Sequence, residues 1–378
     1  MRQITSVRAD KKPAACRMPI RSASRSARVL ISSGTCNSEH TCTGSLLESS
    51  GSIRACQSWF QLILSAESTI RGRFRSCWSG FPDNAACLAY LERLRWPGGF
   101  VCPECGNVGG WRTAKARWMC TGCGRQTSVT AGTIFHRIRT PLSTWFAAIW
   151  FITSQKNGVS AQGLQRVLGF SSYDTAWAWL HKLRRAMVRP DRELLCGLVE
   201  LDEVFVGNES RGRAGGVKDN CAAMIAVESM PGRKLGRVRM EVATIARSAD
   251  LRNFASRVIE PGSLIKTDGA GVLRNLSQMG YEHQFFVGTD SAEPAHVNLP
   301  GVHMVGSLLK RWLTGTLHYA VSQEHLGYYL DEYTFRFNRR TSTSRGLLFY
   351  RLLQQAVNTD PHPLAELRNP VVAVEVPF

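Results

Sequence analysis

Four of the twelve cysteines stand at the spacing of a metal site. They form two Cys-X-X-Cys pairs, Cys102 with Cys105 and Cys120 with Cys123, separated by 14 residues. Tetrahedral zinc takes four thiolates, and each pair can place two sulfurs on one side of the ion. The sequence therefore predicts a zinc ribbon, with two disulfides or a redox motif as the alternatives.

Acidic side chains mark two segments that are typical of β-strands. Asp202 lies within the first segment beside Glu200 and Glu203, and Asp268 ends the second. Because side chains alternate along a strand, Asp202 shares a face with Glu200 while Glu203 points the other way. Neighbouring strands would bring Asp202 beside Asp268, so these two aspartates are candidate ligands of a divalent ion.

The elements around these aspartates predict the fold. Three strand-like runs are followed by a helix and a fourth strand, with one aspartate inside the first strand and the other at the tip of the fourth. This is the layout of an RNase H-like nucleotidyl-transfer core, so we expect an α/β fold with a mixed sheet flanked by helices. The expected strands are 197–207, 221–229, 237–246 and 263–269, and the expected helix is 250–259.

Helical patterns lie between the cysteines and the strands. Residues 142–155 form an almost wholly apolar helix, and Ser160 and Gly169 can start and end a shorter one. Ser172 can then cap a basic helix. Two short helices joined by a turn with glycine are typical of a helix-turn-helix, for which an ordinary helical hairpin is the alternative.

The charge is distributed unevenly along the chain. Of 378 residues, 47 are Lys or Arg and 29 are Asp or Glu, and the whole excess of +18 lies before residue 191. A basic front half favours nucleic acid as the partner, with the chemistry assigned to the balanced back half. The longest apolar run, 145–152, is too short for a membrane span, which needs roughly 20 residues.

Several motifs, in this order, resemble the ISXO-like insertion-sequence transposases, in which a zinc ribbon precedes a DDE-type RNase H-like domain. The resemblance covers roughly residues 74–355 and includes VELDEVFVG, TDG and LLKRWL. It implies that Asp202 and Asp268 are the first two catalytic residues. The family usually has Glu seven residues before the Lys of LLKR, which is Lys310 here, and His303 occupies that position. The implied catalytic set is therefore Asp202, Asp268, His303 and Lys310.

The resemblance implies a DNA transposase that cuts element ends and joins them to target DNA by two-metal-ion phosphoryl transfer. Its cofactors would be structural Zn²⁺ and catalytic Mg²⁺ or Mn²⁺, and imidazole at His303 shifts the expected preference toward manganese. Expected partners are terminal repeats, target DNA and further copies of the chain, in the cytoplasm with the nucleoid. The alternatives are an inactive DNA-binding regulator or domesticated transposase, and a stand-alone RNase H-like nuclease.

The expected organisation has five segments and one set of DNA-binding side chains. For these basic residues a solvated helix face is the competing interpretation, and Trp118 could instead cover the thin core of the ribbon. The segments are a disordered or spurious extension (1–72), the zinc ribbon (73–130), a helix-turn-helix-like region (131–192), the catalytic domain (193–356) and a tail (357–378). The side chains are Arg112, Lys115, Arg117, Lys182, Arg184, Arg185, Lys310, Arg311, Arg336, Arg339 and Arg340.

Overall fold

The computed structural model describes most of the chain after residue 79. All described residues belong to one compact unit, Arg54–Phe378. The extension predicted at 1–72 lies outside the described residues. Among the helices that the structure describes, none is long and apolar enough to span a bilayer. The described ranges are 80–189, 192–206, 221–232, 234–243, 248–268, 271–286, 295–317, 321–342 and 344–368.

A helix and a small sheet come first. Helix α3 (Asn84–Arg95) begins at Asp83, whose Oδ1 accepts a hydrogen bond from the Ala86 amide at 2.8 Å. Three short antiparallel strands follow in the order β1-β2-β3. Their thin core is built on Phe100 and Trp118, whose rings stack 5.2 Å apart. The strands are β1 (Gly110–Arg112), β2 (Trp118–Cys120) and β3 (Gln126–Thr127).

The next helices share a large aromatic core. In it Trp145 of α4 stacks on Trp179 of α6 with ring centroids 3.6 Å apart. The predicted caps of α5 are confirmed: Ser160 Oγ accepts from the Gly163 amide, and Gly169 adopts the left-handed conformation with φ of 67°. Helix α11, from the far end of the chain, packs on α3 and α4 in the same core. The helices are α4 (Leu142–Ser154), α5 (Ala161–Leu168), α6 (Tyr173–Arg185) and α11 (Arg345–Ala356).

A five-stranded mixed sheet forms the second half, in the order β6-β5-β4-β7-β8. Strands β4, β5 and β6 pair antiparallel, whereas β7 and β8 run parallel to β4. The predicted α/β fold with a mixed sheet is therefore confirmed, and β8 is an additional strand that the sequence did not suggest. The strands are β4 (Leu198–Val206), β5 (Cys221–Met230), β6 (Lys234–Ala243), β7 (Leu264–Asp268) and β8 (Glu282–Phe286).

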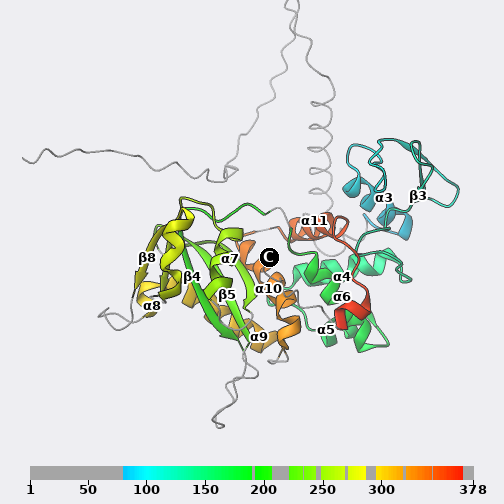
Figure 1. Cartoon of the computed structure of the whole chain (residues 1–378). Coiled ribbons are helices and arrows are strands. Elements are labelled where there is room, and N and C mark those ends of the chain that lie inside the picture. Colours follow the sequence, from blue (N-terminus) through cyan, green and yellow to red (C-terminus); the bar gives the residue numbers. More distant parts are fainter. Residues whose placement is uncertain are drawn as a thin grey trace, which may run out of the picture. The chain divides into compact units, whose positions relative to one another are not determined.

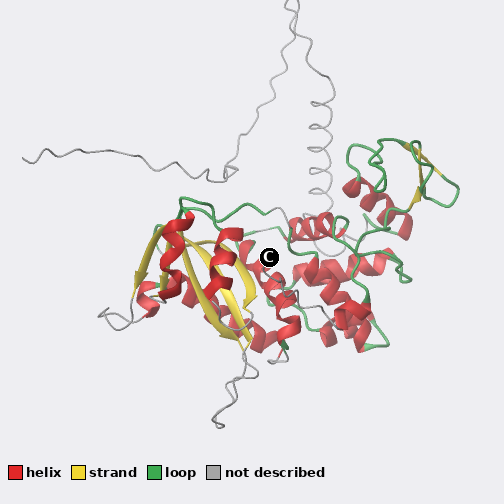
Figure 2. Cartoon of the chain, in the orientation of Figure 1, coloured by secondary structure: helices red, strands yellow, loops and turns green. Residues whose placement is uncertain are grey.

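Helices cover both faces of this sheet (Figures 1 and 2). One apolar layer joins the sheet to α7 and the 3₁₀ helix η1, and the other joins it to α9 and α10. The two layers follow from the alternation of side chains along the central strands. The helices are α7 (Ser248–Val258), η1 (Gly271–Met279), α8 (Ala295–Asn298), α9 (Pro300–Leu317), α10 (Gln323–Asn338) and α12 (Leu364–Arg368).

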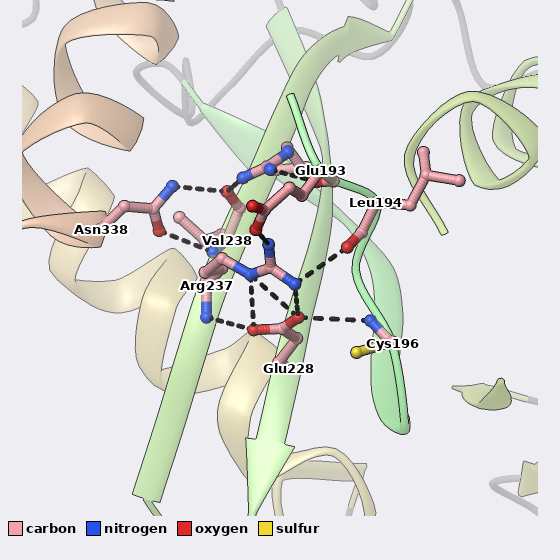
Figure 3. Close-up of polar contacts among 8 residues, drawn as sticks. Glu193, Leu194, Cys196, Glu228, Arg237, Val238 and Asn338 are labelled. Carbon is pink, nitrogen blue, oxygen red and sulfur yellow. Dashed lines mark hydrogen bonds and ion pairs between the residues drawn. The ribbon is translucent and has the colours of Figure 1, made fainter. Parts of the chain in front are cut away.

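A polar network fixes the segment that enters β4 (Figure 3). The buried carboxylate of Glu228 accepts hydrogen bonds from the Arg237 side chain, from the Arg237 amide at 2.8 Å and from the Cys196 amide at 3.2 Å. Arg237 also pairs with Glu193 at 2.9 Å. Asn338, at the end of α10, bonds to both backbone groups of Val238. The start of β4 and the end of α10 are thus tied to β6.

The helical region and the sheet region are joined by buried ionic contacts. Glu332 of α10 pairs with Arg184 of α6 and with Arg336, each at 2.7 Å. Arg336 also donates to backbone carbonyls at the end of α4. A second junction is the Asn157 carbonyl, which accepts from side chains of α9.

Candidate functional site: a four-cysteine cluster and an acidic strand pair

The four predicted zinc ligands come together in the structure. Cys102, Cys105, Cys120 and Cys123 are free thiols whose sulfur atoms lie within 4.8 Å of one another. The Cys102–Cys123 and Cys105–Cys120 sulfurs are 3.7 and 3.6 Å apart. A tetrahedron with metal–sulfur bonds of about 2.3 Å has edges of about 3.8 Å, so the cluster fits a structural zinc ion.

The backbone of each knuckle prepares its sulfurs for a cation. Gly106 and Gly124 have φ of 71° and 70°, a conformation that glycine adopts without strain, and their amides close the turns. In the second knuckle, the amides of Cys123 and Gly122 lower the pKa of the Cys120 thiol to about 6. These amide N–H groups favour the thiolate, which is the form of cysteine that binds a metal.

The hairpin of the ribbon presents an exposed basic surface. Lys115 and Arg117 are exposed, and Trp111 is 54% exposed. Arg112 is exposed as well, but it pairs with Glu92 of α3 and lies over the ring of Trp118. Trp118 itself is half-buried against Phe100, so covering the ribbon core accounts for it.

The two strand aspartates lie on neighbouring parallel strands. The register pairs Glu200 of β4 with Lys266 of β7, and two residues farther along these strands are Asp202 and Asp268. Asp202 is half-buried, and Asp268 ends its strand exposed. This placement of Asp202 and Asp268 on neighbouring strands is the one expected from the sequence.

The surroundings of Asp202 disfavour its negative charge. Burial raises its pKa to about 6, and the charges of Asp268 and Glu203 act in the same direction, against a 2.8 Å hydrogen bond from the Glu203 amide. A carboxylate whose ionisation is costly gains most from a nearby cation. The pair therefore has the electrostatic character of a metal-binding site.

His303 lies in the first turn of α9, the helix that covers the same face of β4 as Asp202. Its side chain is half-buried, and its buried Nε2 has no hydrogen-bond partner among the described residues. A buried, unpartnered ring nitrogen suits a metal ligand, as do the two carboxylates. Within the described part of the chain, however, the four cysteines are the only group of three or more His, Cys, Asp or Glu residues that could hold a metal ion. The structure thus brings Asp202 and Asp268 together without drawing His303 into a preformed cluster.

Two further predicted residues follow on α9. Lys310 and Arg311 are both exposed, two turns beyond His303. They are accessible to a polyanion, and the role of Lys310 at the catalytic site stays a prediction.

The basic residues of α6 correct one prediction. Arg185 is exposed and Lys182 is half-buried, but Arg184 is only 2% exposed and pairs with Glu332. Its guanidinium also lies 4.6 Å from the Tyr329 ring centroid. Arg184 is therefore not available to DNA, because the helix buries this face against α10.

The arginines at the end of α10 are also engaged within the protein. Arg336 pairs with Glu332 and is largely buried, so its predicted contact with DNA is wrong. Arg339 lies over the Phe335 ring, and burial lowers its pKa to about 10. Arg340 donates to the carbonyls of Leu235, Gly236 and Phe337. These contacts account for Arg339 and Arg340 without DNA.

Sequence reasoning missed the role of Glu200. This buried carboxylate accepts hydrogen bonds from Ser229 of β5 and from the Val302 amide of α9. The only signal in the sequence was its alternation with Asp202, since both bonding partners are distant along the chain. Glu200 therefore connects the acidic strand to the helix that carries His303.

Two family models match the chain. Residues 194–338 match the ISXO2-like transposase domain, and residues 82–126 match the transposase zinc-ribbon domain. The comparison with curated proteins found no match. The two matches together span half of the sequence, and they contain the acidic strand pair and the four cysteines respectively. Both domains imply binding to DNA, and the first implies nucleotidyl transfer. The chain belongs to the ISXO2-like transposase family and is a transposase of the insertion-sequence type.

Proposed function

We propose that this transposase cuts the ends of its element and joins them to target DNA by two-metal-ion phosphoryl transfer at Asp202, Asp268 and His303. The observation that carries the proposal is the register of β4 with β7, which brings Asp202 and Asp268 to neighbouring positions. The charge of Asp268 contributes to the raised pKa of Asp202, so the two carboxylates interact. This arrangement supports a shared site for divalent ions.

The residues of the proposed site have separate tasks. Asp202 would hold both ions, and Asp268 and His303 would each complete the ligand set of one. Bound Mg²⁺ or Mn²⁺ would activate a water or a DNA 3′-hydroxyl as the nucleophile, and would stabilise the leaving 3′-oxygen. Burial raises the pKa of Asp202 to about 6, which still lies below neutral pH, so the ionised carboxylate can serve as a ligand. Lys310 and Arg311, exposed on α9, would hold DNA phosphates beside it.

DNA binding would be shared with the front half of the chain. Lys115 and Arg117 on the ribbon and Arg185 at the end of α6 are exposed and suited to phosphate contacts. Because the two element ends must be brought together before they are joined, we expect a dimer or higher assembly on DNA, associated with the nucleoid.

The test is strand transfer with a pre-cut element end, measured with Mg²⁺ and with Mn²⁺. Asp202→Ala and Asp268→Ala should each abolish transfer while leaving DNA binding intact. The control is Glu241→Ala, which removes an exposed acid of β6 that pairs with Arg257, and it should retain activity. His303→Ala should abolish transfer, and unchanged activity would remove His303 from the set. DNA binding without any metal-dependent transfer would favour the alternative, a DNA-binding regulator.

A further inference from the structure

Glu200 is a buried carboxylate on the face of β4 that also carries Asp202. Only 3% of the residue is exposed, and both carboxylate oxygens accept hydrogen bonds from the protein. Oε1 accepts from Ser229 Oγ at 2.6 Å, and Oε2 accepts from the Val302 amide at 3.0 Å. With both oxygens engaged in this way, Glu200 acts as a link between β5, β4 and α9.

The Val302 amide belongs to the first turn of α9, which starts at Pro300. The first amides of a helix have no partner within the helix, and a negative charge at that end is favourable. Glu200 satisfies one of these amides from the neighbouring strand. It therefore fixes the start of α9 relative to the strand that carries Asp202.

Two glycines let α9 lie directly on β4. A Cβ added at Gly301 would lie 2.9 Å from Glu200 Oε2, and one added at Gly306 would lie 2.9 Å from Val204 Cγ2. Either contact is closer than side-chain atoms tolerate, so the helix or the facing side chain would have to shift. Glu200 precedes Asp202 and Val204 follows it on the same face of β4. The two contacts with α9 therefore lie on either side of the aspartate.

His303 lies along α9 between these two glycines. Its buried Nε2 has no hydrogen-bond partner among the residues described, so no hydrogen bond through that atom fixes the ring. The backbone position of His303 depends on how the start of α9 is held, and Glu200 and the two glycines contact this part of the helix.

We propose that Glu200 is a positioning residue that holds the first turn of α9 on β4, so that His303 is directed toward Asp202. This inference rests on the proposed function, in which His303 and Asp202 serve one metal site. Residues that orient ligands through a hydrogen bond typically change metal affinity about 10- to 100-fold when they are removed.

The experiment measures Mn²⁺ binding to the full chain by electron paramagnetic resonance, together with strand transfer at varied Mn²⁺. Glu200→Ala should weaken Mn²⁺ binding at least about tenfold and raise the Mn²⁺ concentration needed for half-maximal transfer. Glu200→Gln keeps an acceptor for the Val302 amide and a group that can bond Ser229, so it should bind nearly as the wild type does. Gly306→Ala leaves Glu200 intact but places a Cβ against the branched side chain of Val204. It should therefore displace α9 and weaken Mn²⁺ binding as well.

The matched control is Leu313→Ala, which removes a buried side chain farther along α9. It should lower the thermal midpoint, as Glu200→Ala does, without changing Mn²⁺ affinity. Wild-type affinity in both Glu200→Ala and Gly306→Ala would overturn the proposal. A Glu200→Gln variant as defective as Glu200→Ala would also overturn it, because the charge itself would then be required. Transfer that persists in Asp202→Ala would instead refute the proposed function.

Discussion

Replacing Glu332 with glutamine should destabilise the fold much more than the loss of one surface charge would. Glu332 is 1% exposed and pairs at 2.7 Å with Arg184, which is 2% exposed, and with Arg336. Burial alone would raise the pKa of Glu332, but the charges of Arg336 and Arg184 outweigh it and hold that pKa below its usual value. The carboxylate is therefore ionised at neutral pH and stabilises two buried cations.

The expected loss of stability follows from the buried arginines that Glu332→Gln leaves without a charged partner. Removing one partner of a buried ion pair typically costs about 3–5 kcal/mol, because the remaining charge is uncompensated. The matched control is Asp174→Asn, which breaks a 2.6 Å pair with Arg368 whose side chains are 60% and 56% exposed. An exposed pair of this kind contributes about 0–1 kcal/mol.

The assay is urea unfolding followed by tryptophan fluorescence at pH 7 and in acid. Because the pKa of Glu332 is lowered on folding, its stabilisation is present at neutral pH and is lost as the pH falls through the folded-state pKa. The difference between wild type and Glu332→Gln should therefore shrink in acid. Adding Arg184→Met to Glu332→Gln should recover part of the loss. Equal effects of Glu332→Gln and Asp174→Asn at pH 7 would refute this reasoning.

Three further outcomes test other parts of the molecule. The pKa of Asp202 rises from 3.8 to about 6 on folding. Ionisation of this carboxyl therefore lowers the stability of the folded protein at pH values above that range. Asp202→Asn should thus raise the melting temperature of the metal-free protein at pH 7 but not below about pH 4, as scanning fluorimetry would show. Cys105→Ser should lower the zinc content measured by mass spectrometry, whereas Cys87→Ser, a buried thiol outside the cluster, should not. Lys115→Ala and Arg117→Ala should each weaken DNA binding and reduce the salt slope by about one, and an unchanged slope would exclude a phosphate contact.

Much of the fold could be predicted because local patterns agree with the final packing. The strands around Asp202 are apolar runs between polar turns, and Ser160 and Gly169 act as the caps that their types suggest. Strand β8 escaped prediction because EHQFF, at the edge of the sheet, is mostly exposed and has neither an apolar run nor a clear alternation. An edge strand is specified by its neighbour, which the sequence does not reveal locally.

The candidate site was predictable only in part. Four cysteines at zinc spacing need no distant information, and an aspartate inside one strand with another at the end of a parallel neighbour is a recognisable layout. Arg184 was misassigned because charge alone does not distinguish a surface residue from a buried one. Its partner, Glu332, lies 148 residues away in the sequence. Glu200 was missed for the same reason, since its partners come from two other elements.

The contacts of the Asn157 carbonyl limit which fragments of this chain can be studied separately. That carbonyl accepts hydrogen bonds at 3.0 and 2.8 Å from Trp312 and Thr316 at the far end of α9. A fragment limited to the matched transposase domain, 194–338, would lose this anchor and would also leave Glu332 without Arg184. Such a truncated chain should be less stable than the intact one, so inactivity in it would not identify a role for Asp202 or Asp268. Biochemical dissection of the enzyme therefore has to rely on point variants of the intact chain.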